Sequence, residues 1–299
     1  LERPATGPAA AGGSRCELPR QVTLVNRAEE VRTVVAALCT PDDEGARVVV
    51  VHGPPGAGKS AVALRAAHQA AWCYPDGQRF VDLTDTALDS ALDSAHWRST
   101  LAGRRELVVV DHCTSAAQLR PLLVAEPGCG FLITADTPLA AIDATCRVTV
   151  GRLSTPAAVA MLGRLVGRPR LTPEWAAVEL VDRCDHLALA VRAAAAVLIA
   201  DPRLGLAELA GRLSSGMVLD ELAVDDLDLR ARLLARYREM SIMDHAAAAA
   251  FQYLGTDGVA AGELSPAVAR RLAEHGLLED GQLAPLTHRV AVELGTGPP

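Results

Sequence analysis

The segment Gly53–Ser60, which reads GPPGAGKS, constrains the fold more than any other part of this chain. It fits the pattern G-x-x-x-x-G-K-[ST], and it lies between an apolar run at 48–51 and a helical segment that begins near Gly58. Glycines let such a backbone curl until successive N–H groups point inward at phosphate oxygens, and the helix start adds its positive end. This context, between a buried strand and a helix, predicts a phosphate-binding loop.

The residue types in the loop carry distinct predicted roles. Lys59 is the only lysine among 29 lysines and arginines, and its flexible stem brings a compact charge to the β and γ phosphates. Ser60 offers a hydroxyl to Mg²⁺. The loop residues that we expect to surround the nucleotide are Gly53, Gly56, Ala57, Gly58, Lys59, Ser60 and Ala61.

A second acid is needed to hold the Mg²⁺ shell, and LVVVD at 107–111 supplies it at the end of an apolar run. Ligands of open α/β sheets bind at the carboxyl ends of the strands, where Asp111 falls. Its alternative role is only to cap the strand. Ser60 and Asp111 are therefore the predicted metal pair, and Lys59 and Asp111 the candidate catalytic residues.

The residue after Asp111 bears on hydrolysis. Fast ATPases place a carboxylate there to activate water, but this chain has His112. A histidine can act as a base, or it can be a bystander at the strand end. The sequence therefore predicts at most a slow ATPase.

Apolar runs alternate with helical patterns in the first half of the chain. The runs lie at 48–51, 79–83, 107–111, 131–134 and 147–150. Strands that alternate with helices predict a parallel sheet with helices on both faces, an α/β fold. From about residue 156 the strand pattern stops and helical patterns follow, until a short hairpin that we expect around Asp280 and Gly281.

These patterns predict four parts. Residues 1–18 are rich in Pro, Gly and Ala, and are expected to form a flexible linker. A P-loop nucleotide-binding domain at 19–155 is followed by an all-helical domain at 156–216 and a winged-helix domain at 217–299. Because no initiator Met is present, we expect the chain to be a fragment of a larger protein.

Composition argues against several partners. A net charge of −7 and an aromatic content of 3% make direct nucleic-acid binding by this segment an unfavourable reading. The longest apolar run, at 193–200, is far shorter than the roughly 20 residues of a membrane span, so no membrane association is expected. Seven dispersed cysteines without a CxxC pair predict reduced thiols and a cytoplasmic location.

The order of the motifs resembles the NB-ARC domain of STAND-type P-loop ATPases, from about residue 18 to residue 294. LPRQVTLVNRAEEV at 18–31 is similar to the opening motif of that family, in which an apolar pair and an arginine lie against adenine. The resemblance implies this role for Leu24, Val25 and Arg27. YPDGQRFVDL at 74–83 and the segment 111–134 are particularly similar to actinobacterial SARP-type regulators of antibiotic biosynthesis.

The helical half carries two further parts of the resemblance. RCDHLALAVRAAA at 183–195 lies where the family has its Gly-Leu-Pro-Leu motif, which implies nucleotide contact at Leu187. LLEDGQLAPLTHRVAVEL at 277–294 resembles the end of the winged helix, where a Met-His-Asp motif places a histidine near the β-phosphate. That histidine is His288, and its alternative is a wing residue without a ligand. The alternative for Arg27 is a solvated residue at a helix start.

The chain departs from the family pattern at several positions. Asp136 stands where the family has an arginine that recognises the γ-phosphate, Ala188 replaces the proline that packs on adenine, and Arg289 replaces the aspartate after the histidine. A carboxylate repels a phosphate, so we expect ADP to bind better than ATP can be used. The alternative role of Asp136 is to cap a following helix.

The resemblance implies an ADP/ATP-binding regulatory switch module, with Mg²⁺, of a larger signalling or transcription-regulatory protein. It further implies slow or weak ATP hydrolysis, self-association on ATP binding, and covalently linked effector and sensor domains. The first alternative is a non-hydrolysing, ADP-bound scaffold, which the carboxylate at position 136 supports. The second is a P-loop small-molecule kinase, although no acid/base motif with an arginine-rich lid follows residue 156.

Overall fold

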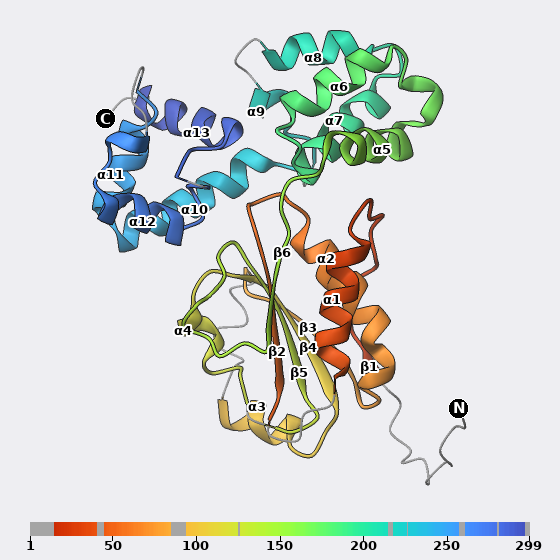
Figure 1. Ribbon diagram of the computed structural model, residues 1–299, viewed down its shortest axis with the longest axis vertical. Helices are drawn as coiled ribbons and strands as arrows, with labels where there is room; N and C mark the ends of the chain where they lie inside the picture. Colours follow the sequence, from red (N-terminus) through yellow and green to blue (C-terminus); the bar gives the residue numbers. More distant parts are fainter. Residues whose placement is uncertain are drawn as a thin grey trace.

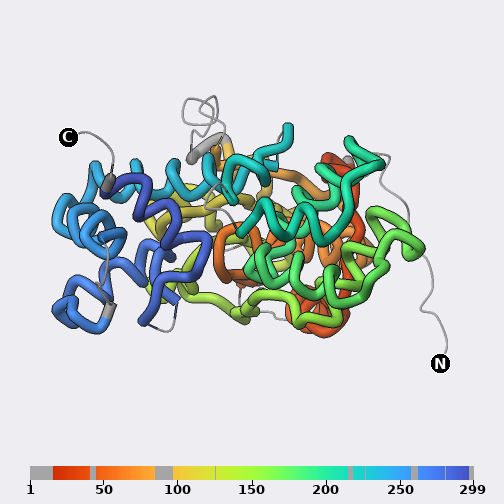
Figure 2. Tube along the Cα trace, turned by 90° about the horizontal axis from the view of Figure 1, so that it is seen from above, coloured from red at the N-terminus to blue at the C-terminus, as the bar shows by residue number. Residues whose placement is uncertain are grey.

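The computed structural model describes residues 15–40, 45–84, 94–124, 126–214, 218–225, 227–256, 261–279 and 281–296. An α/β part comes first along the chain and is followed by helices alone (Figure 1). Seen from above, α5–α8 and α10–α13 form two neighbouring groups over the sheet (Figure 2). None of the described helices has the length and apolarity that crossing a bilayer requires.

Six parallel strands form one sheet in the spatial order β1-β3-β4-β5-β2-β6. The strand bounds are β1 Arg15–Cys16, β2 Arg47–His52, β3 Gly77–Asp82, β4 Glu106–Cys113, β5 Gly130–Ala135 and β6 Cys146–Thr149. The strands β2, β4 and β5 are buried almost throughout, which explains their continuous apolar runs. The predicted parallel sheet is confirmed.

Helices cover both faces of this sheet. On one face lie α1 (Ala28–Cys39) and α2 (Lys59–Ala70), and on the other α3 (Ser94–Leu101) and α4 (Ala116–Leu119) (Figure 1). The pleat of β5 separates the two cores, because Leu132 packs with the first pair of helices while its neighbours Phe131 and Ile133 pack with the second. Because all six strands are parallel, their carboxyl ends lie together at one end of the sheet.

A strand at the lateral edge of the sheet shows that part of the predicted linker is ordered. Arg15 and Cys16 pair with Gly77 and Gln78 of β3, so the expectation of a flexible linker over 1–18 is wrong for these two residues. The edge of β3 offers unpaired N–H and C=O groups, which a short extended segment satisfies whatever its side chains. Residues 1–14 of the predicted linker lie outside the described residues.

The helices that follow the sheet share one hydrophobic core, which runs from Leu153 to Ala291. Their bounds are α5 Thr155–Val166, α6 Glu174–Arg183, α7 Ala188–Ala200, α8 Leu206–Ser214, α9 Val218–Glu221, α10 Leu229–Met243, α11 His245–Tyr253, α12 Pro266–Glu274 and α13 Pro285–Thr296. Short 3₁₀ helices lie among them at Arg168–Arg170 and Ala261–Glu263, and another follows α2 at Ala71–Cys73. At the expected hairpin, Glu279 and Gln282 form a single antiparallel bridge, while Asp280 lies outside the described residues. The winged-helix assignment of 217–299 stays a prediction.

One pair of cysteines departs from the expected reduced state. Cys39 at the end of α1 and Cys73 after α2 form a disulfide, with their Cα atoms 5.8 Å apart. The two helices pack against each other, and this brings the residues together from 34 positions apart in the sequence. The expectation of reduced thiols is wrong for this pair, while Cys16, Cys113, Cys129, Cys146 and Cys184 are free.

The turn after α11 packs so closely on α13 that it requires a glycine. A Cβ at Gly255 would lie 2.1 Å from the backbone oxygen of Ala291. We therefore expect Gly255→Ala to lower the free energy of unfolding by about 1–3 kcal/mol, measured by chemical denaturation. The control Gly211→Ala lies within α8 with open space around it, and should be neutral or slightly stabilising. Equal stabilities of the two variants would contradict the packing of α11 on α13.

Candidate nucleotide-binding site

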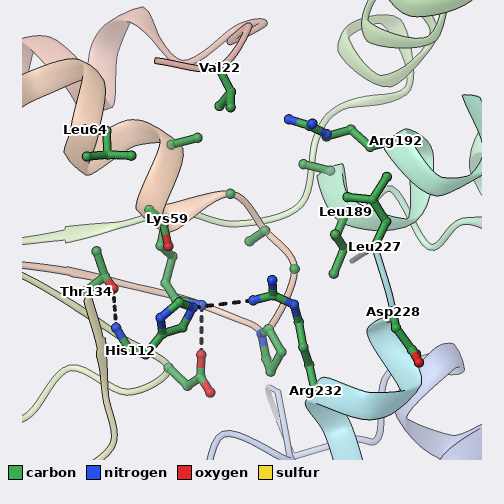
Figure 3. A pocket seen from close by; sticks show the side chains of 18 of the residues that line it. Val22, Lys59, Leu64, His112, Thr134, Leu189, Arg192, Leu227, Asp228 and Arg232 are labelled. Carbon is green, nitrogen blue, oxygen red and sulfur yellow. Dashed lines mark hydrogen bonds and ion pairs between the residues drawn. The ribbon is translucent and has the colours of Figure 1, made fainter. Parts of the chain in front are cut away.

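A cavity of about 990 Å³ lies between the sheet and the helices that follow it. Its lining comes from the segment before α1, the loop before α2, the ends of β4 and β5, and residues of α7 and α10 (Figure 3). The cavity therefore opens at the carboxyl ends of the strands, where α/β sheets bind their ligands.

The phosphate loop has the backbone that its glycines predict. Gly53, Gly56 and Gly58 all have positive φ angles, of 150°, 81° and 98°. At Gly53 a Cβ would lie 2.0 Å from the backbone oxygen of Val150, because β6 runs directly beside the start of the loop. Gly58 precedes α2, whose first residue is Lys59. The loop thus presents the N-terminus of α2 to the cavity, as an anion site requires.

Lys59 is buried and folded back over its own loop. Its Nζ donates to the backbone oxygens of Gly53 and Pro54, each at 2.9 Å, and pairs with Oδ1 of Asp136 at 2.8 Å. Within the described residues 126–214, no helix begins directly after Asp136, since the next element is β6 at Cys146, so the alternative that this residue caps a helix is wrong. Asp136 instead joins the end of β5 to the phosphate loop.

The predicted metal pair is assembled. The Ser60 hydroxyl donates to Oδ1 of Asp111 at 2.8 Å, and the Thr134 hydroxyl donates to the same oxygen. Because β5 lies between β2 and β4, Thr134 fills the space between loop and carboxylate. A hydroxyl and a carboxylate are the hard oxygen donors that Mg²⁺ takes together with nucleotide phosphates and water. Within the described ranges no group of three His, Cys, Asp or Glu residues could hold a metal alone.

His112 is held on both sides of its ring. Its Nδ1 lies 3.1 Å from Oδ1 of Asp82, and its Nε2 lies 3.4 Å from Nη1 of Arg232 (Figure 3). Burial raises the pKa of Asp82, but hydrogen bonds from Thr84 and the nearby His112 outweigh it and hold that pKa below its usual value. The backbone of His112 also adopts a φ of 60°. Engagement of both nitrogens favours the bystander alternative over a free base.

The predicted adenine contacts lie at the cavity. Leu24, Val25 and Arg27 all line it. The Arg27 side chain is buried, donates to Oε1 of Glu30 at 2.8 Å, and donates to the backbone oxygen of Gly151. The alternative that Arg27 is a solvated residue at a helix start is therefore wrong.

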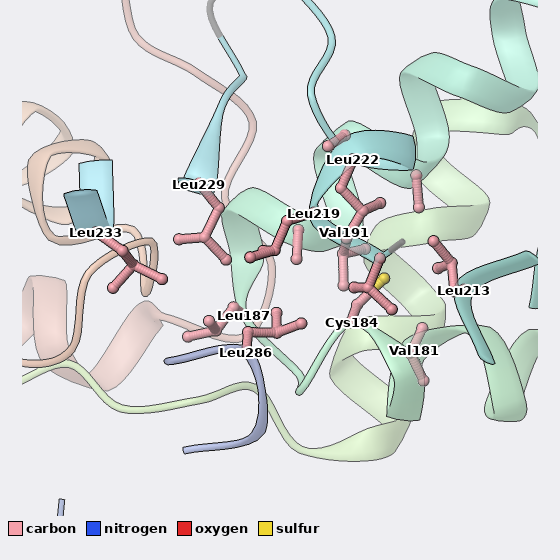
Figure 4. Packing of buried hydrophobic residues seen from close by; sticks show 14 of the residues in the cluster. Val181, Cys184, Leu187, Val191, Leu213, Leu219, Leu222, Leu229, Leu233 and Leu286 are labelled. Carbon is pink, nitrogen blue, oxygen red and sulfur yellow. The ribbon is translucent and has the colours of Figure 1, made fainter. Parts of the chain in front are cut away.

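Of the predicted residues, Gly53, Asp111, Leu187 and His288 do not line the cavity, although Asp111 accepts a hydrogen bond from Ser60, which does. Leu187 packs in the helical core beside Leu286 (Figure 4), because the start of α7 turns this side chain inward. Its place at the loop is taken by Leu189, whose N–H donates to the backbone oxygen of Gly56 at 2.9 Å. His288 is exposed on α13, since that helix uses Leu286 and Val290 to reach the core.

Sequence reasoning missed three arginines of the helical part. Arg192 of α7 and Arg232 of α10 point toward the cavity (Figure 3), and Arg236 lines it one turn after Arg232. The spacing of four residues in LRARLLARYREM places two arginines on one face of a helix, a signal that was present in the sequence. Only the fold shows that this face meets His112 and Asp136 at the ends of β4 and β5.

A further arginine ties the segments around the cavity together. Arg152, between β6 and α5, pairs with Asp185 at 3.0 Å and also with Glu279. Burial alone lowers the pKa of Arg152, but the hydrogen bonds that Arg152 donates to Glu279 and Asp185 raise it above its ordinary value. The Arg152 side chain thus links the segment after β6 to the turn before α7 and to the turn before α13.

The loop, the Ser60–Asp111 pair and the parallel sheet define a P-loop nucleotide-binding fold. The chain is similar to "Regulatory protein AfsR" of Streptomyces griseus, at 33% identity over an alignment of 285 residues that covers 85% of this chain and 29% of the relative. "Regulatory protein AfsR" of Streptomyces coelicolor (strain ATCC BAA-471 / A3(2) / M145) is 32% identical over an alignment of 272 residues that covers 80% of this chain and 27% of the relative. The chain is homologous to a segment of these regulators, which confirms the resemblance to actinobacterial SARP-type regulators.

The chain spans less than a third of the length of these relatives. No family model matches it. Among solved structures, a RuvB mutant of Thermotoga maritima has a TM-score of 0.47 and 12% sequence identity, over 88% of this chain and 87% of that one. The phosphate loop and the two relatives together identify the chain as a P-loop module related to regulatory proteins.

The environment of Lys59 generates a direct test. We expect Lys59→Ala to weaken ADP binding by about 100-fold, measured by isothermal titration, because the charge-assisted bonds to phosphate are lost. Lys59→Arg keeps the charge but is expected to bind weakly as well, since a planar guanidinium does not fit the curled loop. Circular dichroism should show unchanged helix content in both. Undiminished ADP binding by Lys59→Ala would refute the assignment of the loop.

Proposed function

We propose that the chain is an ADP/ATP-binding regulatory switch module of the NB-ARC/STAND type, within a larger signalling or transcription-regulatory protein. The observation that carries this proposal is the composition of the cavity. The phosphate loop, the end of β5 and the helices α7 and α10 all line the same space. A ligand in it touches both the sheet and the helical part, so the nucleotide state can bias their relative arrangement.

In this proposal each part of the nucleotide has its own set of residues. The phosphates lie in the loop 53–60 against Lys59, and Mg²⁺ is held by Ser60 and Asp111 with the phosphates and water. The base lies against Leu24, Val25 and Arg27, which line the cavity before α1. His288 has no part in this proposal, because it is exposed on α13.

Hydrolysis in this proposal is slow. The position after Asp111 holds His112. Its ring nitrogens contact Asp82 and Arg232, so neither nitrogen is free to activate a water molecule. Asp136 places a carboxylate beside Lys59, where it opposes a third phosphate. Binding is therefore better supported than turnover.

The relatives' names extend the proposal to the parent protein. Both are regulatory proteins, and most of their length lies outside the aligned segment. We propose that the parent protein is cytoplasmic, carries effector and sensor domains, takes part in the regulation of antibiotic biosynthesis, and self-associates when ATP replaces ADP. The net charge of −7 of the whole chain supports a lid on the nucleotide, rather than a DNA-binding domain, as the role of 217–299.

A non-hydrolysing scaffold is the second candidate. The contact between Asp136 and Lys59 favours it, because a carboxylate already neutralises the charge that a triphosphate needs. In a scaffold the bound nucleotide stabilises the fold and its identity changes nothing else. The kinase alternative has no comparable observation in its favour.

Nucleotide retention tests the proposed binding function. We expect the purified chain to carry ADP through purification and to release it on denaturation, detected by chromatography and mass spectrometry. Chelation of Mg²⁺ should shorten the retention, because Ser60 and Asp111 then lose the ion that links them to the phosphates. A protein that releases no nucleotide and takes up no ADP in Mg²⁺ buffer would refute the proposal.

Solution mass separates the switch from the scaffold. We expect the chain to be monomeric with Mg²⁺–ADP and to form larger species with Mg²⁺ and the non-hydrolysable analogue adenylyl imidodiphosphate, measured by light scattering. The reason is that only the triphosphate displaces the contacts that close the helical part on the sheet. The same mass and shape with both nucleotides would favour the scaffold.

A further inference from the structure

A carboxylate lies between two buried cations at the inner end of the cavity. Oδ1 of Asp136 is 2.8 Å from Nζ of Lys59, and Oδ2 of the same group is 3.7 Å from Nε of Arg236. The side chains of Lys59 and Arg236 are 10% and 6% exposed. Two cations that are so nearly enclosed require an anion between them, and a single side chain supplies it.

Arg236 keeps a donor free within this arrangement. Its Nε donates to the backbone oxygen of His275 at 2.8 Å, and its Nη1 lies 3.4 Å from Oε2 of Glu239. Its Nη2 is buried and has no hydrogen-bond partner among the described residues. A buried, unpaired guanidinium nitrogen that lines a cavity indicates an acceptor that arrives with a ligand.

The carboxylate is also held in place from the other side. Gly276, with a φ of 68°, packs against Asp136, and a Cβ there would lie 3.1 Å from the Asp136 Cβ. Gly276 belongs to the same turn as His275, which accepts the bond from Arg236. The helical part therefore surrounds Asp136 with one charge and one close backbone contact.

We propose that Lys59 and Arg236 form one anion site, which Asp136 fills in the closed chain and which the terminal phosphate of a nucleoside triphosphate takes over. The inference rests on the proposed nucleotide-binding function and deepens it. The lysine of a phosphate loop contacts the β and γ phosphates, so a third phosphate competes with Asp136 for Nζ. A phosphate oxygen also satisfies Nη2 of Arg236, which the carboxylate leaves unpaired.

The competition makes Asp136 a specificity-determining residue. A diphosphate contacts Lys59 through its β-phosphate and leaves the Asp136–Arg236 pair in place. A triphosphate has to displace the Asp136 carboxylate. Arg236 then exchanges its contact with Asp136 for a contact with the terminal phosphate. Because Arg236 belongs to α10, the third phosphate is sensed by the helical part rather than by a residue at the end of β5.

The test compares the affinities of two nucleotides in three proteins. Binding of Mg²⁺–ADP and of Mg²⁺–adenylyl imidodiphosphate is measured by isothermal titration on the whole 299-residue chain, on Asp136→Asn, and on Glu239→Gln. The amide has the shape of the carboxylate without its charge. Glu239→Gln is the matched control, because it removes one charge beside Arg236 that does not touch Lys59.

We expect Asp136→Asn to raise the affinity for the triphosphate analogue relative to ADP by about tenfold, and Glu239→Gln to leave this ratio within about twofold. An unchanged ratio in Asp136→Asn, or an equal rise in both variants, would overturn the inference while ADP binding still supports the proposed function. A wild-type chain that binds neither nucleotide would overturn the proposed function itself.

Discussion

The ammonium group of Lys59 is the charge on which the rest of the site depends. A buried cation is stable only with oxygen ligands, and Lys59 finds them in the backbone of its own loop and in Asp136. Asp136 in turn faces Arg236, whose bond to the backbone oxygen of His275 anchors α10 to the turn after α12. A chain of electrostatic contacts therefore runs from the phosphate loop into the last third of the protein.

The sheet and most helices could be predicted from the sequence, because their signals are local. Runs such as LVVVD mark strands buried on both faces, and the observed β4 contains that run. β1 could not be predicted, since its pairing uses the backbone of Arg15 and Cys16 and leaves no side-chain pattern. The Cys39–Cys73 disulfide depends on how α1 packs against α2, which no spacing in the sequence encodes.

The same distinction applies to the candidate site. The loop and Asp111 were predictable because the motif and the strand end fix their positions locally, and the structure brings Ser60 and Asp111 into contact. Leu187 and His288 depended on the placement of whole helices, and neither lines the cavity. Arg236 was missed for the converse reason, because its face of α10 acquires meaning only beside Asp136.

The shared core of α5–α13 bears on how the protein can be divided. The sequence suggests a domain boundary near residue 216, yet Leu219, Leu222 and Leu229 pack in the same cluster as Val191 and Leu213 (Figure 4). A gene cut at that point exposes the leucines on both sides, so neither piece retains its complete interior. The smallest piece that keeps this interior intact is therefore the whole helical half. It contains the contacts to the phosphate loop together with Arg236.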